Sequence, residues 1–112
     1  MSTLSTHVLD TALGRPAAGV PVRLERTAPG GGIEVLAHAT TDDDGRVAGL
    51  GPDLLESGRY RMVFDIEAYA ERTERDRFFP EVSVTFEVGE PTEHYHVPLL
   101  LSPYSYTTYR GS

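Results

Sequence analysis

The residues that could carry out hydrolysis near neutral pH are three of the four histidines and one arginine. His94 and His96 lie two residues apart in the segment HYHVPLLLSP, His7 lies in STHVLD, and Arg46 ends the segment TDDDGR. Imidazole is the side chain whose unperturbed pKa lies closest to neutrality, so one ring can deprotonate water while another delivers a proton. The always cationic guanidinium can hold carbonyl oxygens and stabilise an oxyanion. These residue types are sufficient for hydrolysis by direct attack of water.

Other interpretations of the same histidines stay open on pattern alone. Each of His7 and His96 faces away from the regular apolar row of its predicted strand, and a histidine there is commonly just solvated. His94 and His96 could together hold a metal ion, but a catalytic zinc site needs a third protein ligand that the sequence does not provide. The aspartates at positions 42–44 lack the alternate spacing of a calcium loop. No metal and no cofactor are therefore predicted.

The C-terminal residues form a second candidate site. A strand over 104–109 runs directly into Arg110, Gly111 and Ser112. Terminal residues usually fray, so a strand that continues into a Tyr-Arg-Gly-Ser sequence indicates that this tail has a fixed place. In a hairpin with the histidine strand, Thr107 and Tyr109 are expected on the face that carries His96.

The composition bounds the class of protein. The chain has 112 residues, 39% of them hydrophobic and 24% charged, which fits one soluble globular domain spanning residues 1–112. A formal net charge of −7 disfavours a nucleic-acid partner. No apolar run approaches the roughly 20 residues of a transmembrane helix, so no membrane partner is expected. Without cysteines or a secretory signal pattern, a cytoplasmic location is expected.

Period-2 alternation of apolar residues predicts an all-β chain. One short surface helix is predicted over 67–75, where β-branched residues are nearly absent. Many short strands separated by Gly- and Pro-rich turns indicate a two-sheet antiparallel sandwich. The predicted strands cover residues 4–10, 20–25, 33–40, 59–67, 82–88, 94–101 and 104–109.

Three segments, in the same order, resemble the 5-hydroxyisourate hydrolase branch of the transthyretin-like family. They are STHVLDTALGRPAAGVPVRL, TDDDGR, and HYHVPLLLSP together with the closing YRGS. The resemblance implies a transthyretin-like sandwich that opens the six-membered ring of 5-hydroxyisourate, the product of urate oxidation, at an amide bond. It also implies a homotetramer in which two dimers enclose a channel, with the sites at the dimer interface.

The resemblance assigns roles to residues in the matching segments. The implied catalytic residues are His7, Arg46 and His96. The implied substrate-binding residues are His7, Arg46, Tyr109, Arg110, Gly111 and Ser112. The two histidines would share the acid and base roles; His7 is the expected base, because a histidine close to Arg46 has its charged form disfavoured. The alternative is a non-catalytic carrier or binding module, since transthyretin itself shares the sandwich.

Overall fold

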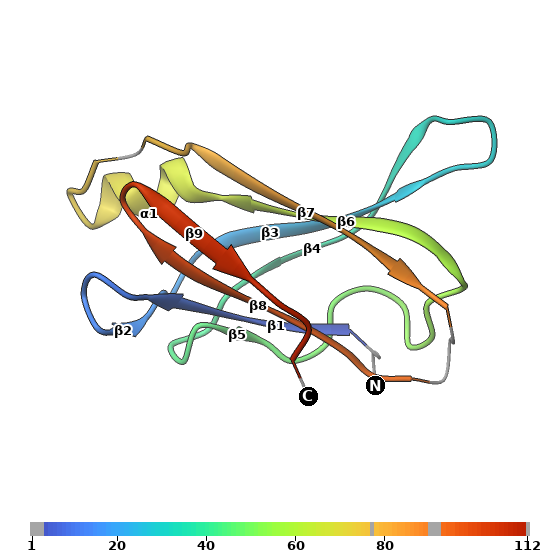
Figure 1. Ribbon diagram of the computed structural model, residues 1–112, viewed down its shortest axis with the longest axis horizontal. Coiled ribbons are helices and arrows are strands. Elements are labelled where there is room, and N and C mark those ends of the chain that lie inside the picture. Colours follow the sequence, from blue (N-terminus) through green and yellow to red (C-terminus); the bar gives the residue numbers. More distant parts are fainter. Residues whose placement is uncertain (1–3, 77, 90–92, 112) are drawn as a thin grey trace.

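Alternating apolar residues build two sheets that pack face to face, as seen in the computed structural model (Figure 1). The structure describes residues 4–76, 78–89 and 93–111. The first sheet has the order β2 (Arg15–Pro16), β1 (Leu4–Asp10), β8 (Tyr95–Ser102) and β9 (Ser105–Thr108), and β5 (Arg46–Val47) also pairs with β1. The second sheet has the order β4 (Ile33–Thr40), β3 (Pro21–Thr27), β6 (Gly58–Asp65) and β7 (Glu81–Val88). The predicted two-sheet sandwich is confirmed.

The core lies between the sheets and is built from one face of each strand. On β8, the buried row predicted from alternation is confirmed, since Tyr95, Val97, Leu99 and Leu101 are all buried. Side chains of the second sheet close the core from the other side, among them Leu24, Met62, Phe64 and Val82. The opposite face of β8, which carries His96, is consequently turned away from the core.

One pairing differs from the antiparallel arrangement that the sequence predicted. β1 and β8 run parallel, whereas every other strand pairing among the described residues is antiparallel. Parallel neighbours require a long connection, and here the whole second sheet and the helix lie between the two strands in sequence. Short-range turn signals do not report such a pairing, because it joins the two ends of the chain.

The single helix of the described chain is shorter than predicted. α1 spans Ile66–Arg72, and the Asp65 side chain caps its first turn by accepting a hydrogen bond from the Ala68 N–H. The cap explains why β6 ends at Asp65 instead of continuing to residue 67. None of the helices in the described ranges is long and apolar enough to cross a membrane.

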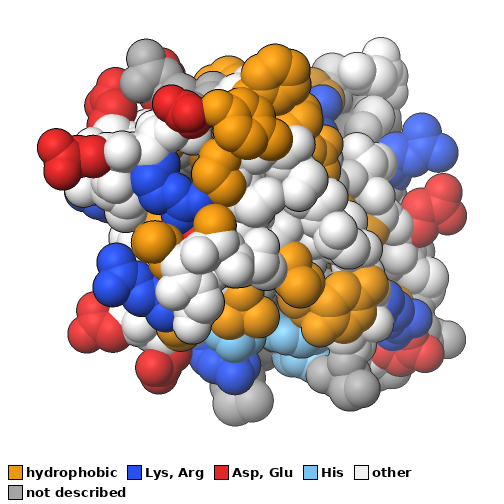
Figure 2. All heavy atoms as spheres, turned by 60° about the vertical axis from the view of Figure 1, so that its left-hand side comes forward, with side chains coloured by type: hydrophobic (Ala, Val, Ile, Leu, Met, Phe, Trp, Pro, Cys, Tyr) orange, Lys and Arg blue, Asp and Glu red, His pale blue; other side chains and the backbone are white. Residues whose placement is uncertain are grey.

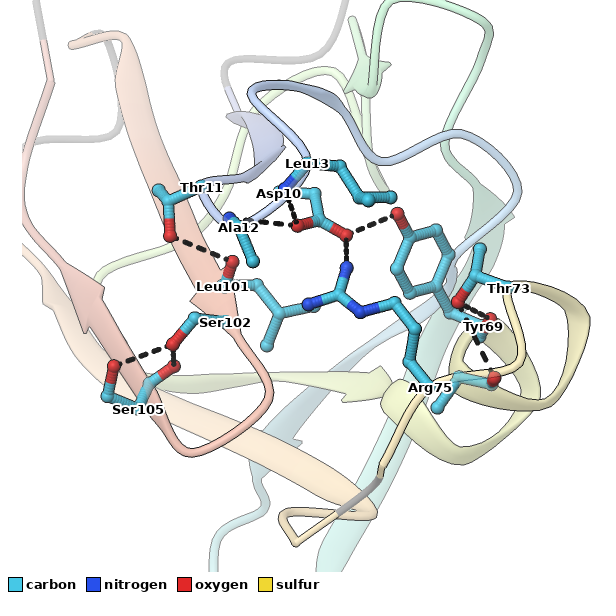
Figure 3. Close-up of polar contacts among 11 residues, drawn as sticks. Asp10, Thr11, Ala12, Leu13, Tyr69, Thr73, Arg75, Leu101, Ser102 and Ser105 are labelled. Carbon is cyan, nitrogen blue, oxygen red and sulfur yellow. Dashed lines mark hydrogen bonds and ion pairs between the residues drawn. The ribbon is translucent and has the colours of Figure 1, made fainter.

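A buried carboxylate fixes the end of β1 to the helix (Figure 3). Asp10 is 1% exposed, and its Oδ1 accepts hydrogen bonds from the backbone N–H groups of Ala12 and Leu13. Its Oδ2 accepts the Tyr69 hydroxyl at 2.7 Å and pairs with the Arg75 guanidinium. Burial, together with Asp10, raises the pKa of Tyr69 to about 12. A buried charge with this many partners is a structural anchor.

The turn before β5 depends on a glycine that lies against β1. The Gly45 carbonyl accepts a hydrogen bond from the Val8 N–H at 2.7 Å, and its backbone is left-handed, with φ +77°. A Cβ at this position would collide with the Val8 carbonyl oxygen and lie 3.1 Å from Cβ of Pro16. Glycine is therefore required both for the conformation and for the close approach of two backbones.

We expect Gly45→Ala to lower the free energy of unfolding by at least about 3 kcal/mol, because steric overlap with backbone adds to left-handed strain. Gly14→Ala is the matched control, since Gly14 has φ +70° and open space around it. This control should cost only the roughly 1–2 kcal/mol of left-handed strain. Urea unfolding of both variants measures the difference, and equal losses would show that the close approach is unimportant.

Candidate functional site

The strand register brings the predicted site residues onto the outward face of the first sheet. His7 on β1 stands opposite Arg46 on β5 and opposite Pro98 on β8. Two residues earlier on β1, Ser5 stands opposite His96. His96 also forms an isolated antiparallel β-bridge with Gly111. Residues opposite each other in a ladder point to the same face. Four separate segments therefore contribute to one surface (Figure 2), where histidine side chains group beside a basic side chain.

His7 is held by the turn that precedes β5. Its Nε2 lies 2.9 Å from the Asp44 carbonyl oxygen, which can only accept a hydrogen bond. The ring proton of neutral His7 is therefore on Nε2, and Nδ1 keeps a lone pair. A neutral imidazole held in this tautomer can accept a proton at Nδ1.

Arg46 owes its position to the same turn. The Asp42 carboxylate accepts hydrogen bonds from the Asp44 and Arg46 N–H groups, both at 2.9 Å. Asp42 and Arg46 are also joined through their backbones, with 2.9 Å between the Asp42 nitrogen and the Arg46 oxygen. The acidic turn is thus an Asx-type turn that holds both the Arg46 backbone and the Asp44 carbonyl contacting His7.

His96 lies among hydrogen-bonding and cationic neighbours. Its Nδ1 is 2.8 Å from the Ser5 hydroxyl, which is also 3.1 Å from Nε2 of His94. Burial lowers the pKa of His96, and the positive charges of His94, Arg46 and His7 lower it further. His96 is therefore kept neutral at pH 7 and has one ring proton to donate.

The C-terminal tail is packed against His96. The Gly111 N–H donates to the His96 carbonyl at 2.7 Å, so the hairpin register continues past the end of β9 and places Tyr109 opposite Pro98. Thr107 and Tyr109 therefore share the face of His96, as predicted. A Cβ on Gly111 would lie 2.6 Å from Cδ2 of the His96 ring. The tail thus lies against the imidazole, at a distance that only glycine allows.

The remaining predicted site residues are less central. Arg110 points to the opposite side of the hairpin, where it pairs with Glu93 at 3.0 Å and lies over the Tyr95 ring at 4.7 Å. Ser112 lies outside the described residues. His38, the fourth histidine, was not predicted to belong to the site, and it is exposed on β4 of the second sheet. Within the described ranges no three His, Asp or Glu side chains gather in a way that could hold a metal ion.

Sequence reasoning missed Ser5. Alternation along residues 4–10 places it on the face of His7, but only the pairing of β1 with β8 reveals that it bridges two imidazoles. No local motif marks a serine whose partners are about 90 residues away.

A two-sheet sandwich with a single short helix and a histidine-bearing outward face defines a transthyretin-like protein. The chain belongs to the HIUase/Transthyretin family, whose model matches residues 4–111. The predicted family is therefore confirmed.

Individual relatives and solved structures cover nearly all of the chain. The 5-hydroxyisourate hydrolase of Salmonella typhimurium is 47% identical over 110 residues, covering 97% of this chain and 80% of that protein. That of Mus musculus is 48% identical over 113 residues, covering 99% and 96%. The structure of Klebsiella pneumoniae 5-hydroxyisourate hydrolase has a TM-score of 0.87 at 38% identity, covering 100% and 94%. Sea bream transthyretin in complex with thyroxine has a TM-score of 0.92 at 32% identity, covering 97% and 94%.

The lowered pKa of His96 has a consequence for stability. The unfolded chain binds a proton at His96 near pH 6.5, whereas the folded chain binds it only at lower pH, so stability rises with pH across that window. We expect an NMR titration of His96 to give a midpoint below 6.5. The contribution to stability should be present above about pH 6.5 and lost as the pH falls through the lowered pKa. A His96→Asn variant should lack this component, and an unshifted titration would contradict the expectation.

The contact of the tail with His96 predicts the effect of a single methyl group. Gly111→Ala should push the tail away from the imidazole and reduce the rate of 5-hydroxyisourate hydrolysis. The melting temperature should change little, because the core is on the other face. Gly89→Ala is the control, since a Cβ there meets no atom within 4 Å. Equal activity of the two variants would show that the tail does not shape the site.

Proposed function

We propose that the protein hydrolyses 5-hydroxyisourate in urate degradation, opening the six-membered ring at an amide bond. The relatives that carry this name cover nearly the whole chain. The observation that carries the proposal is the convergence of Arg46, His7, His96 and Gly111 on one outward face. These residues come from four segments, and none of their side chains belongs to the core cluster.

The geometry supports different roles for His7 and His96. In the proposed reaction His7, whose Nδ1 keeps a lone pair, removes a proton from the attacking water. His96, neutral with one ring proton, donates a hydrogen bond to the departing ring nitrogen. The proton that His7 takes from the water ends on that nitrogen, so both imidazoles finish neutral. Arg46 binds the carbonyl oxygen that becomes an oxyanion and stabilises its charge. Tyr109 and Gly111 line the substrate-binding pocket in this proposal, and Ser112 is proposed to contribute to it. The Arg110 side chain lies on the other side of the hairpin, so the expected contact of Arg110 with substrate is not proposed further.

The carrier alternative is supported by the fold alone. A binding module of the transthyretin type needs an accessible surface but has no use for two imidazoles held in defined hydrogen bonds. One measurement distinguishes the two alternatives: a carrier would leave the ultraviolet decay of freshly generated substrate unchanged, whereas a hydrolase accelerates it.

We also propose that residues 1–112 act as one domain in the cytoplasm.

Replacing either His7 or His96 by Asn should reduce turnover by roughly the 10²- to 10⁴-fold that accompanies loss of an acid or base. The melting temperature should change little, because both rings lie outside the core cluster. The double variant should lose less than the product of the single losses, since groups acting as a unit are not additive. His38→Asn, on the exposed face of the second sheet, is the matched control. Wild-type turnover in either single variant would refute the assignment.

We further propose a homotetramer with the sites at a dimer interface. β9 forms one edge of the first sheet and β7 one edge of the second, and open edges favour pairing with another chain. Near the β9 edge, Phe78, Tyr104 and Tyr106 are 67%, 64% and 41% exposed. The outward histidine face of a single chain is likewise open to a second chain.

Light scattering at micromolar concentration should give four times the mass of one chain. Tyr106→Lys should lower that mass, because an edge lysine opposes strand-to-strand pairing. Ile33→Lys is the control, since Ile33 is 55% exposed at the opposite edge of the second sheet, on β4. A monomeric wild-type protein would rule out the tetramer.

A further inference from the structure

Ser5 is a small polar residue that links two imidazoles. Its hydroxyl oxygen lies 2.8 Å from Nδ1 of His96 and 3.1 Å from Nε2 of His94. Ser5 is 9% exposed and His96 is half-buried, so water has little access to the contact between them, whereas His94 is exposed. The two rings lie 6.5 Å apart and nearly parallel, at 15°. The hydroxyl therefore bridges two rings whose orientations match.

A hydroxyl has one proton and can give it to only one of the two nitrogens. For both contacts to be hydrogen bonds, the other imidazole must donate its own N–H to the oxygen. Two arrangements satisfy this condition. In the first, His94 Nε2–H donates to Ser5, and Ser5 donates to His96 Nδ1; in the second, His96 Nδ1–H donates to Ser5, and Ser5 donates to His94 Nε2.

The arrangements differ in what His96 offers to a substrate. Nδ1 is engaged by Ser5, so Nε2 is the ring nitrogen left for the reaction. In the first arrangement Nε2 carries the proton, and in the second it carries a lone pair. The first also places the proton of each neutral ring on Nε2, the tautomer that free histidine favours. The first arrangement is therefore the more stable one.

The positive charges around His96 keep its ring neutral. His94 faces it from the residue before β8, His7 from β1 and Arg46 from β5, while the tail that follows β9 contributes the uncharged Gly111. Any of the three basic groups opposes a second proton on the ring. If His94 itself becomes cationic, its Nε2–H must still donate to Ser5, which preserves the first arrangement.

We propose that Ser5 and His94 are positioning residues that keep the ring proton of His96 on Nε2, where the N–H donates a hydrogen bond to the departing nitrogen. The catalytic part of this inference rests on the proposed function. The tautomer of His96 is a property of the protein alone and can be measured without substrate.

The first test uses 15N NMR of the rings about two pH units above the ordinary histidine pKa of roughly 6.5, where imidazoles are neutral. His96→Asn identifies the His96 signals. Wild type should show an unprotonated Nδ1 and a protonated Nε2 in His96. Ser5→Ala and His94→Phe should both increase the Nδ1–H fraction. A proton on Nδ1 in the wild type, or unchanged tautomers in both variants, would overturn the proposal.

His94→Gln supplies the matched rescue, because the amide nitrogen of Gln can donate to Ser5 from nearly the place of Nε2, whereas Phe cannot. His94→Gln should keep the wild-type tautomer. In turnover measurements, Ser5→Ala and His94→Phe should lower kcat about tenfold with little change in KM, less than the roughly 10²- to 10⁴-fold effect of losing the acid itself. His94→Gln should stay near wild type.

The results distinguish the proposed hydrolase function from the positioning role of Ser5 and His94. If wild type shows the Nε2–H tautomer but does not accelerate decay of 5-hydroxyisourate, the proposed function fails and the positioning role stands. If wild type is active but His94→Gln is as impaired as His94→Phe, the donor role of His94 is wrong. Thermal melts of all variants check that the losses do not come from unfolding.

Discussion

The outward face of the first sheet depends on the parallel pairing of β1 with β8. Because side chains alternate along a strand, a slip of one residue in this register would turn either His7 or His96 toward the core. The buried rows on both strands resist such a slip, since Val8 and Leu99 stand opposite each other and are fully enclosed. Hydrophobic burial on one face thus fixes the geometry of hydrogen-bonding groups on the other.

Buried charges also fix strand positions, one in each sheet. Asp10 ties the end of β1 to the helix, and Glu25, 4% exposed on β3, lies between the guanidinium groups of Arg23 and Arg61. The hydrogen bond from Arg23 lowers the pKa of Glu25 against the opposing effect of burial. Removing one partner from such a cluster would leave an uncompensated charge, which costs more than the pair contributes. Both carboxylates therefore raise the free energy of alternative strand arrangements.

The sequence was sufficient to locate most of the strands, but not to predict which strands far apart in sequence pair with each other. Alternation located seven of the strands and the buried row of β8, because burial on one side of a strand leaves a local pattern. No strand was predicted between residues 10 and 20, yet β2 lies there, a two-residue strand that makes no such pattern. The helix limits shifted because the Asp65 cap was not recognised.

The site was predictable only where the resemblance supplied it. Pattern alone could not distinguish His7 and His96 from solvated strand residues, since their significance lies in a register between segments about 90 residues apart. The same limit applies to Ser5, which has no distinguishing neighbours in sequence. The position of Gly111 over the His96 ring likewise follows from hairpin register and from the absence of a side chain, and only coordinates display it.

The division between a buried face and a reactive face affects how such a protein can diverge. Ser5, His7, Arg46 and His96 contribute no side chain to the core cluster, so exchanging them changes chemistry with little penalty in folding free energy. A sandwich organised in this way can acquire a new ligand through a few surface substitutions. The close structural match to a sea bream transthyretin solved with thyroxine is consistent with this separation of stability from specificity. New ligand specificity in this fold is then limited by whether a ligand can reach the outward face, and not by whether the fold tolerates the substitutions.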